Sequence, residues 1–198
     1  MAEDEWAELR GVVAARVLGR SPELTKDLAE HLTAVLDDDL TRDPEIQRLL
    51  MQLAHNTIVE SMGAMPDLSP PPQARTLAAA IALGRLLATH GVPACTTDQV
   101  FHVAQAWWQD AVLREFGRAQ PTASPMGMLA PVMNWQLRGF LGMADAAGQE
   151  HAAVMDTWRQ QSSSSLSSRV SFVLADVEVA SEAEDVLHYA MSGRHLGL

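Results

Sequence analysis

The sequence predicts an all-α protein, a multi-helix bundle of about six helices followed by a short C-terminal connector. Leu and Ala recur at three- and four-residue spacing, which is typical of amphipathic helices. Capping residues and Gly/Pro stop signals divide the chain into segments of helical length. No segment before Arg159 shows the alternation of a strand. With 198 residues and 47% hydrophobic residues, the chain is long enough to bury a core.

The first two helices are predicted from charge placement and an apolar stripe. We expect the first over residues 3 to 18, with acidic residues at the positive end of its dipole. The second is expected from Ser21, as its capping residue, to about Asp38. Its apolar stripe consists of Leu24, Leu28, Leu32 and Val35.

The next two helices form a pair around a proline-rich loop. Asp43-Pro44-Glu45 is a helix start signal, and the third helix is expected to reach about Met62. The prolines of residues 66 to 72 exclude a helix there. A fourth helix is expected over residues 73 to 90, ended by Gly91 and Pro93.

The last two predicted helices are long. Thr97-Asp98 is expected to cap a helix over residues 98 to 117, which is apolar around more than half of its circumference. Residues 130 to 161 predict one further helix, with Pro131 in its first turn. The serine-rich segment 162 to 168 is compatible with either a helix or a flexible joint.

Composition excludes several classes of function. The formal net charge of -11 repels phosphate backbones, so the chain is not expected to bind nucleic acid. A single cysteine, Cys95, excludes an internal disulfide, and the acidic N-terminus does not resemble a secretion signal. No apolar run reaches the roughly 18 residues of a membrane span. We therefore expect a cytoplasmic protein without membrane contact.

Enzyme and metal motifs are missing from the sequence. Asp27 and His31 are one i, i+4 pair, which favours a surface helix pair over a metal site. Nucleotide-loop and hydrolase motifs do not occur, so we predict no enzyme, no metal and no cofactor. A haem-binding or globin-like protein, with His55, His90 or His102 as ligand, is the less favoured alternative.

Four residues are candidates for binding a small molecule: Arg85, Trp107, Trp108 and His55. The two indoles are suited to line a pocket, although packing in the core or at a dimer interface is the more common role of tryptophan. Gly84 lies in the expected buried stripe of its helix, where a missing side chain lets another helix approach. Arg85 beside it would cover small residues and reach an acidic partner or solvent.

Three stretches resemble the N-terminal region of PucR/CdaR-type bacterial transcriptional regulators. These are "DPEIQRLLMQLAHNTIVESM", "ALGRLLATHGVPACTTDQVFHVAQAWW" and "RVSFVLADVEVASEAEDVLHYAMSGRHLGL". The first domain of that family is similar to the all-helical N-terminal domain of stressosome co-antagonist proteins. The last stretch looks like the family's connector and the first strand of its GGDEF-like domain.

The resemblance implies a division of the chain and a function. Residues 1–161 would be a helical regulatory or sensory domain, and 162–198 a connector and the start of a truncated next domain. The chain would form a homodimer, respond to a small-molecule effector and reach DNA only through absent C-terminal domains. The alternative is a helical protein–protein interaction module that binds no ligand.

Overall fold

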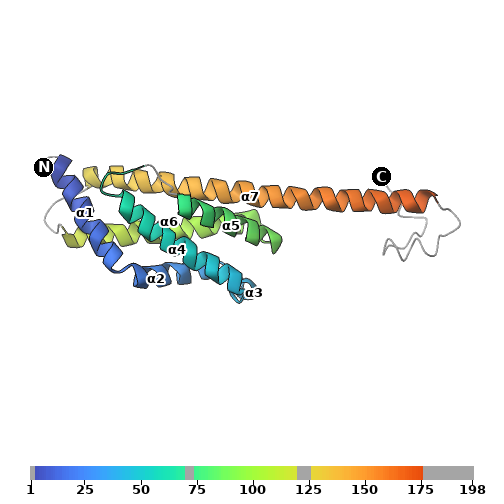
Figure 1. The fold of residues 1–198 in the computed structure, drawn as a ribbon, viewed down its shortest axis with the longest axis horizontal. Helices are drawn as coiled ribbons and strands as arrows, with labels where there is room; N and C mark the ends of the chain where they lie inside the picture. Colours follow the sequence, from blue (N-terminus) through green and yellow to red (C-terminus); the bar gives the residue numbers. More distant parts are fainter. Residues whose placement is uncertain (1–2, 70–73, 120–125, 176–198) are drawn as a thin grey trace. The chain divides into compact units, whose positions relative to one another are not determined.

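The computed structural model describes residues 3–69, 74–119 and 126–175. Within these three ranges every helix is an α-helix and no strand occurs, which confirms the predicted all-α fold (Figure 1). The chain divides into two units, Met1–Val154 and Met155–Leu198. The helical bundle and the candidate site lie in the first unit.

Helices α1 (Glu3–Gly19) and α2 (Ser21–Thr33) follow one another directly. The backbone nitrogen of Arg20 donates to Val17 at 3.0 Å, and Leu24 donates to Arg20 at 3.0 Å, so hydrogen bonding continues through the corner. The predicted cap at Ser21 is wrong, because Arg20 holds the cap position and makes no side-chain cap bond. This corner carries the Arg20 side chain toward the end of another helix.

The predicted extension of the second helix to Asp38 is also wrong. After Thr33 the backbone tightens, with Val35 bonded to Leu32 and Leu36 to Thr33. Leu36 is buried by this turn, and a single-turn helix α3 (Asp38–Thr41) follows. Burial of Leu36 thus outweighs the helix propensity of the segment.

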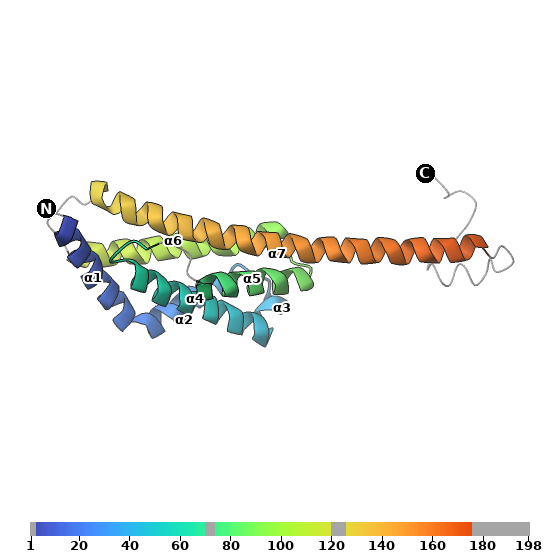
Figure 2. The same cartoon turned by 45° about the horizontal axis from the view of Figure 1, so that its top comes forward.

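Helix α4 (Pro44–Ala64) begins where the sequence indicates. The Asp43 carboxylate accepts hydrogen bonds from the backbone nitrogens of Glu45 at 2.7 Å and Ile46 at 3.3 Å. Helix α5 (Ala74–Thr89) packs beside it (Figure 2). The Glu60 side chain of α4 accepts from the backbone nitrogen of Thr76 at 2.9 Å, so one helix caps the start of the other.

The predicted stop after α5 is confirmed. Gly91 has a φ of +71°, the left-handed conformation that favours glycine after a helix. Val92 donates to the Leu87 carbonyl and Gly91 to the Ala88 carbonyl, which satisfies two carbonyls of the last turn.

Helix α6 (Ala94–Ala119) begins earlier than expected. The predicted cap at Thr97-Asp98 is wrong, because Pro93 precedes the first turn and its carbonyl accepts from the nitrogens of Thr96 and Thr97. Thr97 is buried instead of capping. The two tryptophans of α6, Trp107 and Trp108, are both buried.

Helix α7 (Met126–Ala175) is continuous through the serine-rich segment, so of the two alternatives the structure has the helix. Pro131 lies inside this helix and not in its first turn, because the helix starts at Met126. Residues 129, 132, 136, 140, 143 and 147 of α7 are buried at helical spacing. The α7 segment up to Val154 therefore belongs to the bundle core.

The core of the first unit is one apolar cluster drawn from six helices, α1, α2, α4, α5, α6 and α7. Helix α2 packs on α4 and α6, and α1 packs on α4 and α6. Among the described residues, the large side chains that are fully buried include Trp108, Trp135, Phe101, Ile46, Met62 and Leu83. The Trp135 indole also donates to the Ser69 carbonyl at 2.5 Å, which ties α7 to the segment after α4.

Candidate functional site

A cavity of about 180 Å³ lies between α2 and α6, with α1 contributing Val17. Two contacts fix how the helices pass each other. Arg20, at the start of α2, meets Glu115 near the end of α6, whereas Asp27 meets Trp107 about two turns earlier on α6. The two helices are therefore antiparallel along the cavity, which we call the α2–α6 cavity.

One part of the cavity wall is apolar. Val17, Leu24 and Ala111 supply aliphatic surface, and the Trp107 indole supplies an aromatic edge. Trp107 is stacked on Trp108, with ring centroids 6.1 Å apart and an interplanar angle of 13°. The aromatic part of the wall is therefore held in place by packing against Trp108, which is buried in the core.

The remaining wall is formed by six charged side chains, three of each sign: Arg20, Glu23, Asp27, Arg114, Glu115 and Arg118. Three of them, at positions 20, 23 and 27, belong to α2 and the residue before it, and three, at positions 114, 115 and 118, belong to α6. Because residues three or four positions apart share a face of a helix, each set lies on one side of its helix. The cavity is thus lined by balanced charge in a strongly acidic protein.

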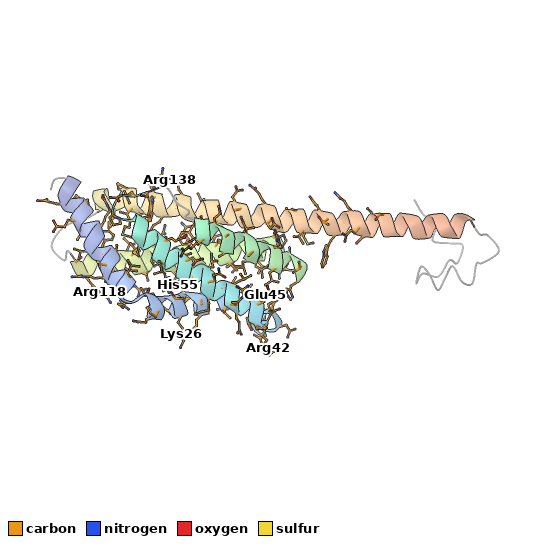
Figure 3. The ribbon with its side chains drawn as sticks, in the orientation of Figure 1. Lys26, Arg42, Glu45, His55, Arg118 and Arg138 are labelled. Carbon is orange, nitrogen blue, oxygen red and sulfur yellow. The ribbon has the colours of Figure 1, made fainter. Side chains whose placement is uncertain are left out.

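Glu115 is the central carboxylate of this cluster. Its side chain is only 8% exposed, and its Oε1 accepts from Arg20 Nη1 at 2.9 Å and from Arg118 Nη1. Arg118 comes from the C-terminal end of α6 (Figure 3). A carboxylate buried to this degree needs such partners, because an unpaired charge there would be costly.

Arg20 binds two carboxylates at once. Its Nε and Nη2 donate to the two carboxylate oxygens of Glu23, at 3.3 and 3.0 Å, and its Nη1 donates to Glu115. The hydrogen bond and charge of Glu23 raise the pKa of Arg20, with a smaller contribution from Glu115. The same contact lowers the pKa of Glu23. Both groups are charged at neutral pH.

Asp27 and Arg114 carry the other opposite charges of the cavity. The Asp27 carboxylate accepts from the Trp107 indole nitrogen at 3.1 Å. Arg114 donates to Asp110, one turn back on its own helix, and this hydrogen bond is the main reason that its pKa is raised. The negative charge of Asp27 raises the pKa of Arg114 further, whereas the positive charge of Arg20 lowers it. The Arg114 guanidinium therefore interacts electrostatically with both ends of the cavity.

The four candidate residues from the sequence fall in different places. Trp107 lines the α2–α6 cavity, and Trp108 lies fully buried behind it. Arg85 donates from Nε to Glu150 Oε1 of α7 at 2.7 Å, as expected for an arginine that reaches an acidic partner. His55 is exposed on α4 (Figure 3). Only Trp107 of these four lines the cavity.

The arginines and Glu115 were missed as site residues by sequence reasoning. A signal existed, because charged residues recur every three or four positions on both helices. Such spacing is also that of any solvated helix face. The cavity forms where a face of α2 meets a face of α6, and these helices are far apart in the chain. Asp27 and Trp107, which are in contact, are separated by 80 residues.

The described residues contain no group of three or more His, Cys, Asp or Glu side chains arranged to hold a metal ion. Of the histidines considered as haem ligands, His90 pairs with Asp43 at 3.2 Å, and His55 and His102 are exposed. Asp27 and His31 form the expected exposed pair, 3.5 Å apart. Among the helices that the structure describes, none has the length and apolar character to cross a membrane.

Comparisons with known proteins return no relative: no protein-family model, curated protein or solved structure matches this chain.

Proposed function

We propose that the chain is the N-terminal regulatory domain of a bacterial transcriptional regulator, which senses a small molecule and does not itself bind DNA. The observation that carries this proposal is the continuity of α7. One helix runs from Met126 to Ala175, and its first part lies in the bundle core while its last part belongs to the second unit. A change in bundle packing would therefore act on a helix that continues into the next part of the chain.

Three contacts support the transmission of such a change, because they hold α7 to neighbouring segments. Gly84 of α5 abuts the Ala147 backbone, Arg85 pairs with Glu150, and the buried His151 ring contacts the Val92 carbonyl at 2.7 Å. Close contacts of this kind resist gradual deformation, so a shift of α5 would displace the part of α7 that it touches.

The charge of the chain and its resemblance to PucR/CdaR-type regulators support the other parts of the proposal. A net charge of -11 disfavours direct contact with DNA, which would be left to other domains of the regulator. We propose that the domain acts in the cytoplasm, has no catalytic activity and uses no cofactor.

We also propose that the domain is a homodimer. Trp158, in the second unit, exposes 46% of its surface on α7, and exposed tryptophan is typical of contact surfaces. The same observation favours the second candidate function, a protein–protein interaction module without a ligand.

A transcription assay of the complete gene tests the regulatory function. The reading frame beyond Leu198 is sequenced first, and a helix-turn-helix in the same frame is expected. A reporter under the regulator's own promoter is then measured with Gly84→Ala, which disturbs the α5–α7 contact, and with Gly148→Ala as control, because a Cβ at Gly148 meets nothing within 4 Å.

We expect Gly84→Ala to change reporter expression and Gly148→Ala to leave it unchanged. A frame without any DNA-binding region would contradict the proposal. So would identical expression from both variants when both accumulate to the wild-type level. A purified protein with the absorption of haem would favour the cofactor class instead.

A further inference from the structure

We propose that the α2–α6 cavity binds a small zwitterion of the α-amino-acid type, with Arg114 holding its carboxylate and Asp27 its ammonium group. The inference rests on the proposed sensory function and names the ligand class of that site. It follows from the balance of charge, from which charges are already paired, and from the size of the cavity.

The charges of the cavity favour a ligand that carries both signs. Three arginines and three carboxylates line it, within a protein whose net charge is -11. A simple anion would be repelled by the carboxylates, and a simple cation would be repelled by the guanidiniums. A zwitterion places each of its charges beside an opposite one, so both ends contribute to its binding.

Most of the lining charge is paired within the wall. Arg20 uses Nε, Nη1 and Nη2 on Glu23 and Glu115, and Arg118 donates to Glu115. These four groups form a neutral cluster in which each charge has an opposite partner. The wall's other two charged groups are Arg114 and Asp27.

Arg114 and Asp27 retain capacity for a ligand. A guanidinium has five N–H donors, and the Arg114 hydrogen bond to Asp110 uses one of them. A carboxylate has about four acceptor positions; Asp27 accepts from the Trp107 indole with Oδ2, and its Oδ1 lies 3.5 Å from His31 Nδ1, so acceptor positions remain on both oxygens. The indole bond holds Asp27 at the cavity wall, and the exposed Arg114 side chain lines the same cavity.

The size and the apolar wall define the rest of the ligand. A cavity of about 180 Å³ equals about six water molecules in liquid volume, which suits a molecule of roughly six to ten non-hydrogen atoms. Val17, Leu24 and Ala111 would contact a short hydrocarbon side chain.

Thermal unfolding of the whole chain with the common L-α-amino acids as probes tests the proposal. At about ten times its Kd, a bound amino acid is expected to raise Tm by about 3 to 6 °C. Propionate and propylammonium serve as single-charge probes at the same ionic strength. Neither should raise Tm, because each satisfies only one side of the cavity.

Two variants assign the binding groups. Arg114→Gln and Asp27→Asn should each abolish the rise in Tm, and both sites are exposed enough to keep the fold, which circular dichroism checks. Arg48→Gln is the matched control, an exposed arginine of α4 that pairs with Glu45 and does not line the cavity. It should keep the full response.

The outcomes separate this inference from the proposed function. The zwitterion site is overturned if no amino acid raises Tm, if the single charges do so equally, or if the response survives in both cavity variants. If an amino acid binds but does not change reporter expression, the ligand site stands and the sensory function fails. If none binds while Gly84→Ala alters expression, the regulatory function stands without this ligand.

Discussion

Gly84 of α5 packs directly on the backbone of Ala147 of α7. A Cβ atom built at Gly84 would lie 3.0 Å from both the Cα and the carbonyl carbon of Ala147, and closer still to its oxygen. The next residue, Arg85, pairs with Glu150 one turn further along α7. Backbone contact and ion pair together fix these two helices side by side, at the position where the sequence carries its Gly-Arg pair.

Gly84→Ala is expected to destabilise the protein by about 1–3 kcal/mol, because the new methyl group meets backbone that cannot turn aside. Gly148→Ala is the control and should stabilise it by up to about 1 kcal/mol, since alanine favours a helix and open space surrounds this position. Urea unfolding monitored by circular dichroism measures both. Equal stability of the two variants would show that α5 and α7 are not in contact at Gly84.

Glu115→Gln is expected to lower stability by about 1–3 kcal/mol, because Arg20 and Arg118 would then lose their shared buried carboxylate. Glu30→Gln is a matched control on α2, since Glu30 pairs with Lys26 at the surface and contributes little. The free energies of unfolding of the two variants are compared at neutral pH. A loss no larger than that of the control would show that Glu115 is hydrated.

Gln136→Met is expected to stabilise the protein by about 1–2 kcal/mol. Gln136 is 3% exposed, and neither of its amide atoms has a hydrogen-bond partner in the structure. A buried amide without partners is unfavourable, whereas methionine has a similar length and no such requirement. Gln149→Met, at an exposed site of the same helix, is the control. A destabilised Gln136→Met would indicate that the amide is bonded in solution.

The Arg20–Glu23 contact predicts a specific pH dependence. Because Arg20 lowers the pKa of Glu23 in the folded protein, the contribution of the pair is fully present above the unfolded value of about 4.3. It is lost as the pH falls through the lower folded value. An NMR titration should find the Glu23 pKa below the ordinary glutamate value, and Arg20→Gln should return it toward that value. An unchanged pKa in the variant would exclude Arg20 as the cause.

Trp158→Ser is expected to weaken self-association about tenfold or more, since a truncated interface tryptophan commonly costs more than 1 kcal/mol. Gln160→Ser is the control at a neighbouring exposed position. Light scattering over a range of protein concentrations gives the dimer dissociation constant. A wild-type chain that stays monomeric throughout, or a variant that dimerises as well as wild type, would contradict the homodimer.

Parts of the fold were predictable because local rules decide them. The start of α4 at Asp43 and the end of α5 at Gly91 each depend on residues within one turn of the chain, and both predictions are confirmed. The predicted caps at Ser21 and Thr97 are wrong for a different reason. Arg20 takes the cap position before Ser21, and Pro93 provides an earlier start for α6, so a possible cap does not always begin a helix.

The candidate site was predictable only in part. Trp107 was identified from its aromatic character, but the residues that give the cavity its charge were not. Arg114 and Asp27 are exposed charged residues on separate helices, and their spacing equals that of an ordinary solvated face. His55 and Arg85 have equally suitable side chains, yet they lie on α4 and α5, outside the wall of the cavity.

The sequence by itself determined the all-α class, the acidic surface, and the role of Gly84 as a point of close packing, because periodicity, charge and side-chain size are local properties. Only the tertiary structure decided that α2 and α6 run antiparallel around a cavity, that Glu115 is buried between Arg20 and Arg118, and that Ala147 is the partner of Gly84. These features depend on contacts between segments far apart in the chain, where the burial of apolar faces selects which polar side chains meet.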